Sequence, residues 1–244
     1  MLKKIIDNFI PKIFTKKNYL KYFYFGYVKN LKINGVYRFS REKYDRRALI
    51  SAVIISKISK IKNIKYLEIG CDRDGTFNSI PLDVNNKTGV DPVRGGTHRM
   101  TSDKFFENNY EKFDIIFIDG LHTYSQTKKD FLNSLKVLNE NGVIFFDDML
   151  PVDWAMQFEP RFQGKSTGDV WKLAAEIFDS KMFDFKIIKS NYGIGVLEVI
   201  GNNTKIPDND YSNLTFKEYL DYANNKFNII NSSEFIKYKI NNYA

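Results

Sequence analysis

The chain has 244 residues, of which 43% are hydrophobic and 27% are charged. This composition supplies enough apolar material for a packed core and excludes a disordered or fibrous chain, and the length predicts one large domain or one domain with extensions. Lys and Arg total 37 against 29 Asp and Glu, a net charge of +8. That charge is compatible with an anionic partner, such as nucleic acid, an anionic membrane face or a phosphorylated small molecule.

Membrane-spanning and exported classes find no support in the sequence. The longest apolar stretch, residues 48–56, is far shorter than the roughly 18 residues that a membrane helix needs. Residues 1–14 are basic and apolar, but Lys, Asp and Pro interrupt them before a continuous signal-peptide core forms. The single cysteine, Cys71, can form neither an internal disulfide nor a cysteine-based zinc site. We therefore expect a cytoplasmic protein.

The chain begins with a Lys- and aromatic-rich segment, and a regular alternation of elements follows it. Apolar residues at helical spacing predict a helix over 45–60. The predicted strands that come next cover residues 65–69, 87–91, 113–119 and 142–148. The last two are continuous apolar runs that end in carboxylates, and such runs are typical of parallel strands buried on both faces.

Another helix is predicted between the last two of these strands. Phe131, Leu135 and Leu138 form its apolar face, and Gly142 stands where a helix C-cap belongs. The elements that follow are a helix at about 168–181 and strands at 183–190 and 194–200. Residues 191–193 join those two strands as a tight hairpin. Strand–helix alternation closed by an antiparallel hairpin predicts a doubly wound α/β sheet.

Ligands of doubly wound sheets bind beyond the carboxyl ends of the strands, so the residues there are candidates for a site. Gly70 and Gly75 allow a tight turn and a close backbone approach to a ligand. Their spacing resembles a P-loop, but Thr76 and Phe77 replace the required Lys and Ser/Thr. Asp72 stands where the dinucleotide fingerprint needs its second glycine. The sequence therefore argues against both ATP cradling and dinucleotide binding.

An acidic residue ends the second predicted strand. Asp91 lies 21 positions after Gly70, and a carboxylate at this spacing can accept both hydroxyls of a ribose. A nucleoside ligand without a pyrophosphate satisfies the pattern, and S-adenosylmethionine is the obvious candidate. Ordinary loop chemistry would account for either residue alone, whereas the two together favour the ligand.

Three carboxylates follow two neighbouring strands. Asp119 ends the third predicted strand, and Asp147 and Asp148 end the fourth. A strand–helix–strand unit places such strands side by side, so the three side chains can converge. Adjacent anions repel unless a cation or a proton lies between them, and oxygen ligands suit Mg²⁺, Ca²⁺ or Mn²⁺ rather than zinc. The sequence predicts a divalent-cation site here; the alternative is that Asp119 or Asp148 caps a helix.

A histidine stands beside these carboxylates. His122 follows Asp119 by three residues, and its ordinary pKa near 6.5 suits it to take a proton from a substrate hydroxyl at neutral pH. A divalent ion on the aspartates would orient two substrate oxygens and lower the pKa of one of them. The alternative is an ordinary loop histidine whose hydrogen bonds are satisfied.

The chain resembles class I S-adenosylmethionine-dependent methyltransferases in five segments: LEIGCDRDGTF, GVDP, MTSDKFF, FDIIFIDGLHTY and NGVIFFDD. It is similar in particular to the metal-dependent sugar O-methyltransferase group, whose members carry I-D-G-x-H-x-Y followed by a D-D pair. The resemblance covers about residues 45–200. It implies a mainly parallel, seven-stranded, Rossmann-like methyltransferase sheet with an antiparallel C-terminal hairpin strand.

The resemblance also implies roles for residues on the cofactor side. Glu68 and Gly70 are expected to line the methionine side of S-adenosylmethionine, and Asp91 to hold its ribose. Ser102 and Asp103 are expected to lie against the adenine.

On the catalytic side, the resemblance implies that Asp119, Asp147 and Asp148 bind the metal, most simply Mg²⁺. His122 is implied as the catalytic base, and Asp119 as a residue of both the catalytic and the cofactor-binding sets. The family pattern is not complete, because Asn141 replaces a usual glycine.

The implied domain organisation has three parts. An N-terminal helical and aromatic extension covers 1–44, an S-adenosylmethionine-binding catalytic domain covers 45–200, and a C-terminal extension of one or two helices, packed on that domain, covers 201–244.

Several further residues have two interpretations each. His98 either contacts a substrate phosphate or shapes its loop, and Asp169 either caps a helix or contacts substrate. Trp171 is expected in the core. A cluster of arginines either holds a nucleotide diphosphate or forms a solvated positive face; its members are Arg38, Arg41, Arg46 and Arg47.

The predicted function is S-adenosylmethionine-dependent O-methylation of a hydroxyl on a nucleotide-activated or surface-polysaccharide sugar, assisted by a divalent metal. A nucleic-acid methyltransferase is an alternative, disfavoured because the N/D-P-P-Y/F/W signature is missing and the basic residues are scattered. A non-catalytic S-adenosylmethionine-binding scaffold is the other alternative. The expected partner is a small-molecule sugar substrate, and homo-oligomerisation is left open.

Overall fold

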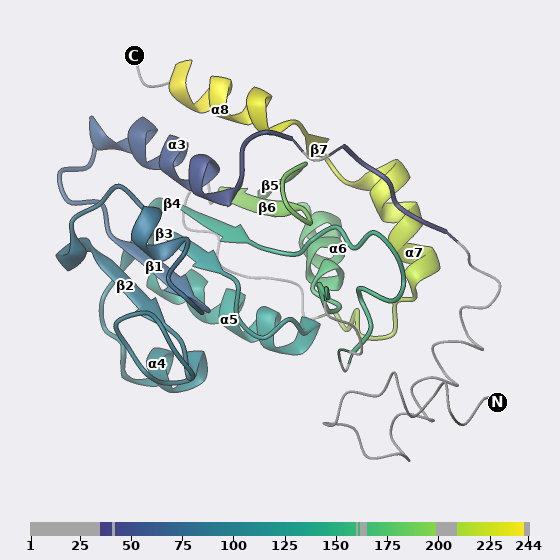
Figure 1. Ribbon diagram of the computed structural model, residues 1–244, viewed down its shortest axis with the longest axis horizontal. Coiled ribbons are helices and arrows are strands. Elements are labelled where there is room, and N and C mark those ends of the chain that lie inside the picture. Colours follow the sequence, from purple (N-terminus) through teal and green to yellow (C-terminus); the bar gives the residue numbers. More distant parts are fainter. Residues whose placement is uncertain (1–34, 41, 160, 162–164, 199–208, 242–244) are drawn as a thin grey trace.

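A computed structural model of the chain describes residues 35–40, 42–159, 161, 165–198 and 209–241 (Figure 1). Most of the N-terminal extension predicted over 1–44 therefore lies outside the described residues, as does Arg41. The three-part division of the chain stays a prediction.

The centre of the molecule is one seven-stranded sheet in the order β2-β1-β3-β4-β6-β5-β7. Its strands are β1 (Tyr66–Ile69), β2 (Lys87–Val90), β3 (Phe113–Ile118), β4 (Leu138–Phe146), β5 (Asp184–Ile188), β6 (Ile194–Glu198) and β7 (Ile229–Ile230). β6 runs antiparallel to both of its neighbours, and the other neighbouring pairs are parallel. The prediction of a mainly parallel sheet closed by an antiparallel hairpin is confirmed.

Helices cover both faces of this sheet (Figure 1). They are α3 (Arg46–Ile58), α4 (Ser102–Asn108), α5 (Tyr124–Val137), α6 (Trp171–Ser180), α7 (Phe216–Asp221) and α8 (Ser232–Asn241). One apolar core lies under α3 and α8, and it includes Leu49, Val53 and Phe235. A second core lies under α4 to α7 and includes Phe105 and Phe131. The sheet thus forms the middle of three layers.

The packing of β3 explains why residues 115–118 form a continuous apolar run. Ile115 and Phe117 belong to the core under α3 and α8, whereas Ile116 and Ile118 belong to the core on the opposite face. Successive side chains of a strand point to opposite faces, and here both faces are covered. A continuous apolar run is therefore what a central strand of this sheet requires.

Two predictions about element boundaries are wrong. α5 ends at Val137, and Leu138 already pairs with Phe113 as the first residue of β4. Gly142 is therefore not a helix cap but a residue of β4, where a Cβ atom would lie 2.5 Å from Leu138 Cγ. Asn141 takes the left-handed conformation, with φ of +57°, at the position where the family resemblance implies a glycine.

The C-terminal segment contains more than the predicted helices. After α7 the chain makes a π-helical turn, Tyr222–Lys226, and then adds β7 beside β5 at the edge of the sheet. α8 follows and lies along α3 (Figure 1). A two-residue strand is too short for any periodicity to reveal it in the sequence.

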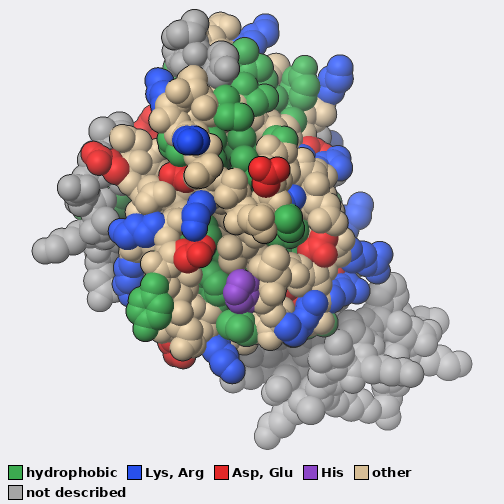
Figure 2. Space-filling model, turned by 90° about the vertical axis from the view of Figure 1, so that its left-hand side faces the viewer, with side chains coloured by type: hydrophobic (Ala, Val, Ile, Leu, Met, Phe, Trp, Pro, Cys, Tyr) green, Lys and Arg blue, Asp and Glu red, His purple; other side chains and the backbone are tan. Residues whose placement is uncertain are grey.

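Figure 2 shows how the charged side chains are distributed on one face of the molecule. On the face seen in Figure 2, Lys and Arg side chains of the described residues are dispersed among Asp and Glu side chains. Among the described residues, no helix has both the length and the apolar character needed to cross a membrane.

Candidate active site

The carboxyl ends of β1, β3 and β4 meet at one edge of the sheet. The hydrogen-bond ladder continues past the strands, since Asp119 N donates to Ile69 O at 2.8 Å and Asp147 N donates to Ile118 O at 3.1 Å. The main chain thus fixes the first residues beyond β3 and β4. The predicted convergence of the three aspartates follows from this register.

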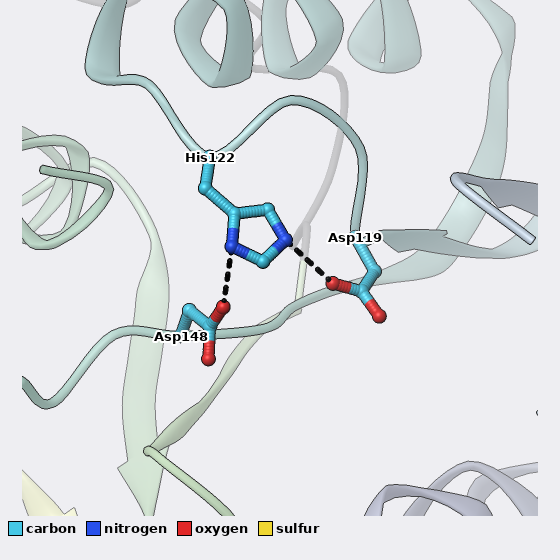
Figure 3. Close-up of side chains that lie close together, drawn as sticks. All are labelled: Asp119, His122 and Asp148. Atoms are coloured by element: carbon cyan, nitrogen blue, oxygen red, sulfur yellow. Dashed lines mark ion pairs between the residues drawn. The ribbon is translucent and has the colours of Figure 1, made fainter. Parts of the chain in front are cut away.

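Asp119, His122 and Asp148 form the centre of the site (Figure 3). His122 Nδ1 lies 2.9 Å from Asp148 Oδ2, and His122 Nε2 lies 3.4 Å from Asp119 Oδ1. Ligand atoms of the three residues all lie within 4.8 Å of one another, a distance suited to sharing one metal ion. The imidazole therefore lies between two carboxylates that come from two different strands.

Asp147 faces a different partner. It pairs with Arg46 of α3, whose Nη1 also lies 2.9 Å from Asp119 Oδ2. The guanidinium carbon lies 5.7 Å from the centre of the Phe117 ring. Of the two interpretations of the arginine cluster, the solvated positive face is thus wrong for Arg46, because its side chain is only 29% exposed and pairs with Asp119 and Asp147. Arg47 instead pairs with Asp45 on the surface.

Burial and mutual repulsion change the acidity of these groups. Burial, with the neighbouring charge of Asp119, raises the pKa of Asp147 to about 6, against the attraction of Arg46. Burial and the charge of Asp147 likewise raise the pKa of Asp148 to about 6. Burial also raises the pKa of Asp119. Burial opposes the charged form of His122, but its bonds to Asp119 and Asp148 outweigh that effect and raise its pKa to about 11.

The loop that carries His122 is held by the segment before α6. Gly168 has φ of +59°, and a Cβ atom there would lie 1.5 Å from the His122 carbonyl oxygen. Asp169 Oδ1 accepts a hydrogen bond from Tyr124 N at 2.6 Å, so it caps the start of α5. Thr123 supplies the second cap by accepting from Gln126 N. Asp119 therefore does not cap this helix, and the close packing at Gly168 fixes where the histidine lies.

Gly70 lies in close contact with the backbone that follows β3. With φ of +89°, it packs against the end of β3, and a Cβ atom there would lie 1.9 Å from Asp119 O. The backbone that it approaches is thus the protein's own. Any side chain at position 70 would therefore displace the backbone of Asp119.

The carboxylate of Asp91 is mostly engaged by its own loop. Oδ1 accepts from Val93 N and Arg94 N, and Oδ2 accepts from Asp72 N. Burial tends to raise the pKa of Asp91, but these backbone bonds lower it below the ordinary value. A carboxylate has about four acceptor positions, so one remains for a ribose hydroxyl.

Glu68 is buried beneath the site. Its Oε2 accepts a hydrogen bond from Tyr66 OH at 2.6 Å. Burial, with the charge of Asp119, raises the pKa of Glu68 to about 8, although the bond from Tyr66 favours the ionised form. Glu68 is thus a largely neutral acid at pH 7, poised to ionise when a cationic group approaches.

Ser102 and Asp103 begin α4, where Gln126 of α5 contacts both. Gln126 Nε2 lies 3.3 Å from Ser102 Oγ and 2.9 Å from Asp103 Oδ1, and it also donates to Asp130 Oδ1 at 3.1 Å. Burial raises the pKa of Asp130 to about 6. Neither Gln126 nor Asp130 was identified from the sequence as a residue of this region. Polar residues are common on an amphipathic helix, so no pattern in the sequence indicates that these two make contacts with α4.

Two other predictions have clear outcomes. Trp171 is fully buried, as expected for a core residue. His98 shapes its loop, because its backbone N–H donates to Gly89 O at 2.8 Å and its carbonyl accepts from Asp91 N. Its ring packs edge-on against Phe105.

Replacing Gly70 with alanine is expected to destabilise the protein by about 2–5 kcal/mol, since the new methyl group must displace the Asp119 backbone and the residue would adopt a left-handed conformation. Gly75→Ala in the same loop is the matched control, because its Cβ would meet nothing within 4 Å; the expected change is below about 0.5 kcal/mol. Urea unfolding of the two variants measures both values. Equal stabilities would contradict the packing described for Gly70.

Comparison with known proteins agrees with this architecture. A family model described as "Methyltransferase domain" matches residues 70–149, which include the turn after β1 and the carboxylates after β3 and β4. A relative in Acanthamoeba polyphaga mimivirus, the uncharacterised protein R132, is 26% identical over 173 residues, covering 58% of this chain and 70% of the viral protein.

Two solved structures overlap with this one at low sequence identity. An O-methyltransferase of Bacillus cereus, in complex with SAH, is 14% identical, with 77% of this chain and 93% of that one covered and a TM-score of 0.43. The O-methyltransferase TomG of Streptomyces achromogenes, involved in tomaymycin synthesis and in complex with SAM, is 11% identical, with 78% and 93% covered and a TM-score of 0.45. Overlaps of this extent do not identify a ligand or a substrate.

The family match covers the part of the chain in which the strand ends of a mainly parallel seven-stranded sheet bring Gly70, Asp91, Asp119 and Asp148 to one edge. Residues 70–149 are therefore similar to a methyltransferase domain, and this segment contains the strand ends that form the candidate site.

Proposed function

We propose that the protein transfers the methyl group of S-adenosylmethionine to a hydroxyl of a sugar, which is nucleotide-activated or part of a surface-polysaccharide precursor, with the assistance of a divalent cation. Mg²⁺ is the expected ion. A cytoplasmic location and homo-oligomerisation stay predictions.

The observation that carries the proposal is the meeting of Asp119, His122 and Asp148 within 4.8 Å beside the cofactor edge of the sheet. Two carboxylates can hold a hard cation, and an imidazole beside them can receive a proton. An arrangement of this kind suits deprotonation of a hydroxyl, which is the acceptor chemistry of an O-methyltransferase.

The cofactor side has a charge that suits S-adenosylmethionine. This molecule carries a sulfonium and an ammonium group, and it supplies the methyl group when bound. Glu68 offers a buried carboxylate and Asp119 a half-buried one toward those cations, and Asp91 keeps one acceptor position for a ribose hydroxyl. Ser102 and Asp103 are proposed to border the adenine from the start of α4.

The donor set also suits a divalent cation. Asp119 and Asp148 supply hard oxygen ligands, the type that Mg²⁺ prefers, and we assign Asp147 as the third. A bound ion would hold the acceptor hydroxyl and lower its pKa. Two adjacent hydroxyls on a sugar ring offer the pair of oxygens that such an ion takes from a substrate.

His122 then acts as the proton acceptor. Its side chain is 37% exposed, so a substrate hydroxyl can reach the ring from solvent. Asp148 and the Ser166 carbonyl lie 2.9 Å and 3.2 Å from Nδ1, and they orient the ring so that Nε2 points toward Asp119. Gly168 holds the backbone of the same residue, so the base is positioned from both sides.

The test is incubation of the full chain with S-adenosylmethionine, Mg²⁺ and a panel of nucleotide sugars, followed by mass spectrometry. We expect one sugar to gain a single methyl group, and we expect that gain to disappear with a chelator and to return when Mg²⁺ is restored. Methylation of RNA or DNA alone would contradict the sugar assignment, and transfer that is insensitive to chelation would contradict the cation.

Cofactor binding is also expected to release a proton from Glu68. Because the pKa of Glu68 is about 8, the side chain is mostly neutral at pH 7 and must ionise to pair with the ligand's ammonium. Calorimetric titrations in two buffers of different ionisation enthalpy measure the release, which is expected to approach one proton. Glu68→Gln is the control and should release none; equal heats in both buffers for the unsubstituted protein would rule out this role for Glu68.

A further inference from the structure

A positive side chain already occupies part of the proposed cation site. Arg46, the first residue of α3, reaches across to the ends of β3 and β4, where Nη1 contacts Asp119 Oδ2 at 2.9 Å and pairs with Asp147 Oδ2. The distance in sequence is large, 73 residues to Asp119 and 101 to Asp147. The contact is therefore a product of the fold.

These pairings and one backbone hydrogen bond engage most of the carboxylate oxygens of the three aspartates. Asp119 has one oxygen toward His122 and the other toward Arg46. Asp148 Oδ2 faces His122, and Asp147 Oδ1 accepts a hydrogen bond from Asp148 N at 2.9 Å. A divalent ion that used Asp119 Oδ2 or Asp147 Oδ2 would lie against the guanidinium, where like charges repel.

Helix α3 keeps Arg46 in this place. Asp45 caps the helix by accepting from Arg47 N at 3.0 Å and from Ala48 N at 3.4 Å, and Leu49 and Ile50 are buried under it. The side chain of Arg46 therefore extends from a helix whose first turn is capped and whose inner face is packed. The Phe117 ring beside the guanidinium provides an apolar wall on one side.

We propose that Arg46 is a positioning residue that takes the place of the divalent cation when none is bound, holding Asp119 and Asp147 together, and that it must withdraw for the ion to bind. This inference rests on the proposed cation site. The guanidinium compensates the acidic cluster in the metal-free protein and competes with the ion, so it sets the affinity for the metal.

The test compares Mn²⁺ binding to the unsubstituted protein, to Arg46→Gln and to Arg47→Gln by electron paramagnetic resonance of free Mn²⁺. Arg46→Gln is expected to bind Mn²⁺ at least about tenfold more tightly, because a competing charge in direct contact is removed. Arg47→Gln is the matched control, because it removes the same charge from the next residue. Among the described carboxylates, Arg47 pairs only with Asp45. The Mn²⁺ affinity of this variant should stay close to that of the unsubstituted protein.

A second measurement follows Arg46 in the unsubstituted protein. In the ¹⁵N-labelled protein, the Nε–H resonance of Arg46, assigned by its absence from Arg46→Gln, is expected to shift on titration with Mg²⁺, whereas that of Arg47 stays in place. If the unsubstituted protein binds Mn²⁺ but Arg46→Gln binds it no more tightly and the Arg46 resonance does not move, the inference is overturned while the proposed cation site stands. If neither protein binds Mn²⁺, the proposed cation site itself fails.

Discussion

His122→Ala is expected to lower kcat for methyl transfer by about 10²- to 10⁴-fold, the usual contribution of a positioned general base, while the affinity for S-adenosylmethionine stays unchanged. The imidazole of His122 lies between Asp119 and Asp148, and its side chain is 37% exposed, so a substrate hydroxyl can reach it. The substitution removes the group that receives the hydroxyl proton. It leaves Glu68 and Asp91, the residues proposed to bind the cofactor, unchanged.

The chain offers a matched control for this experiment, since it contains only two histidines. His98→Ala removes the other imidazole, which contacts Thr97 and Phe105 on the loop after β2. We expect this variant to keep most of its turnover. Initial rates at saturating cofactor measure the effect on kcat, and calorimetry measures the effect on cofactor affinity. Full turnover by His122→Ala would show that His122 is not the general base.

The second large effect concerns the protonation of His122 in the metal-free protein. The two carboxylates raise its pKa to about 11, far above its ordinary value near 6.5, so the ring is a cation at neutral pH. A protonated ring cannot accept a proton. Any cation that takes over the charge of Asp119 and Asp148 removes the cause of this shift, so Mg²⁺ is expected to lower the pKa of His122 toward its ordinary value.

Long-range ¹H–¹⁵N NMR of the two imidazoles measures this pKa directly. We expect the His122 signals to remain those of the cation from pH 6 to beyond pH 9 without metal, and Asp148→Asn to lower the pKa by removing the closer carboxylate. His98→Ala assigns the signals. A metal-free His122 that titrates near pH 6.5 would contradict the geometry of Figure 3.

The same shift has a consequence for stability. Because the pKa of His122 is higher in the folded protein than in the unfolded chain, its ion pairs stabilise the fold fully below about pH 6.5. This contribution is lost as the pH rises through about 11. Urea unfolding of the metal-free protein across this range should therefore show a decline that His122→Ala lacks.

Much of the site could be predicted because parallel strands end at a common edge. The apolar runs of β3 and β4 indicated two neighbouring buried strands, and Asp119 and Asp148 follow them directly. Their convergence needed only the rule that a strand–helix–strand unit brings such ends together. His122 came with them, because it lies three residues after Asp119 in the same loop.

Neither interpretation of the arginine cluster placed Arg46 among the aspartates, although its sequence position carries a signal for the interior. It stands three, four and seven residues before Leu49, Ile50 and Val53, all of which are fully buried. A helix repeats its face at these spacings, so Arg46 belongs to the side of α3 that faces the sheet. Charge alone suggested solvent, whereas the helical phase points inward.

The sequence by itself determined the class of fold, the strand ends that carry the carboxylates and the histidine beside them, because hydrophobic periodicity and strand polarity are local properties. Only the tertiary structure decided which charges meet. The pairing of Arg46 with Asp147, the support of His122 by Gly168 and the neutral state of Glu68 each join segments far apart in the chain or depend on burial. Electrostatic energies depend on distance and solvent exposure in three dimensions, and those quantities do not exist until the chain has folded.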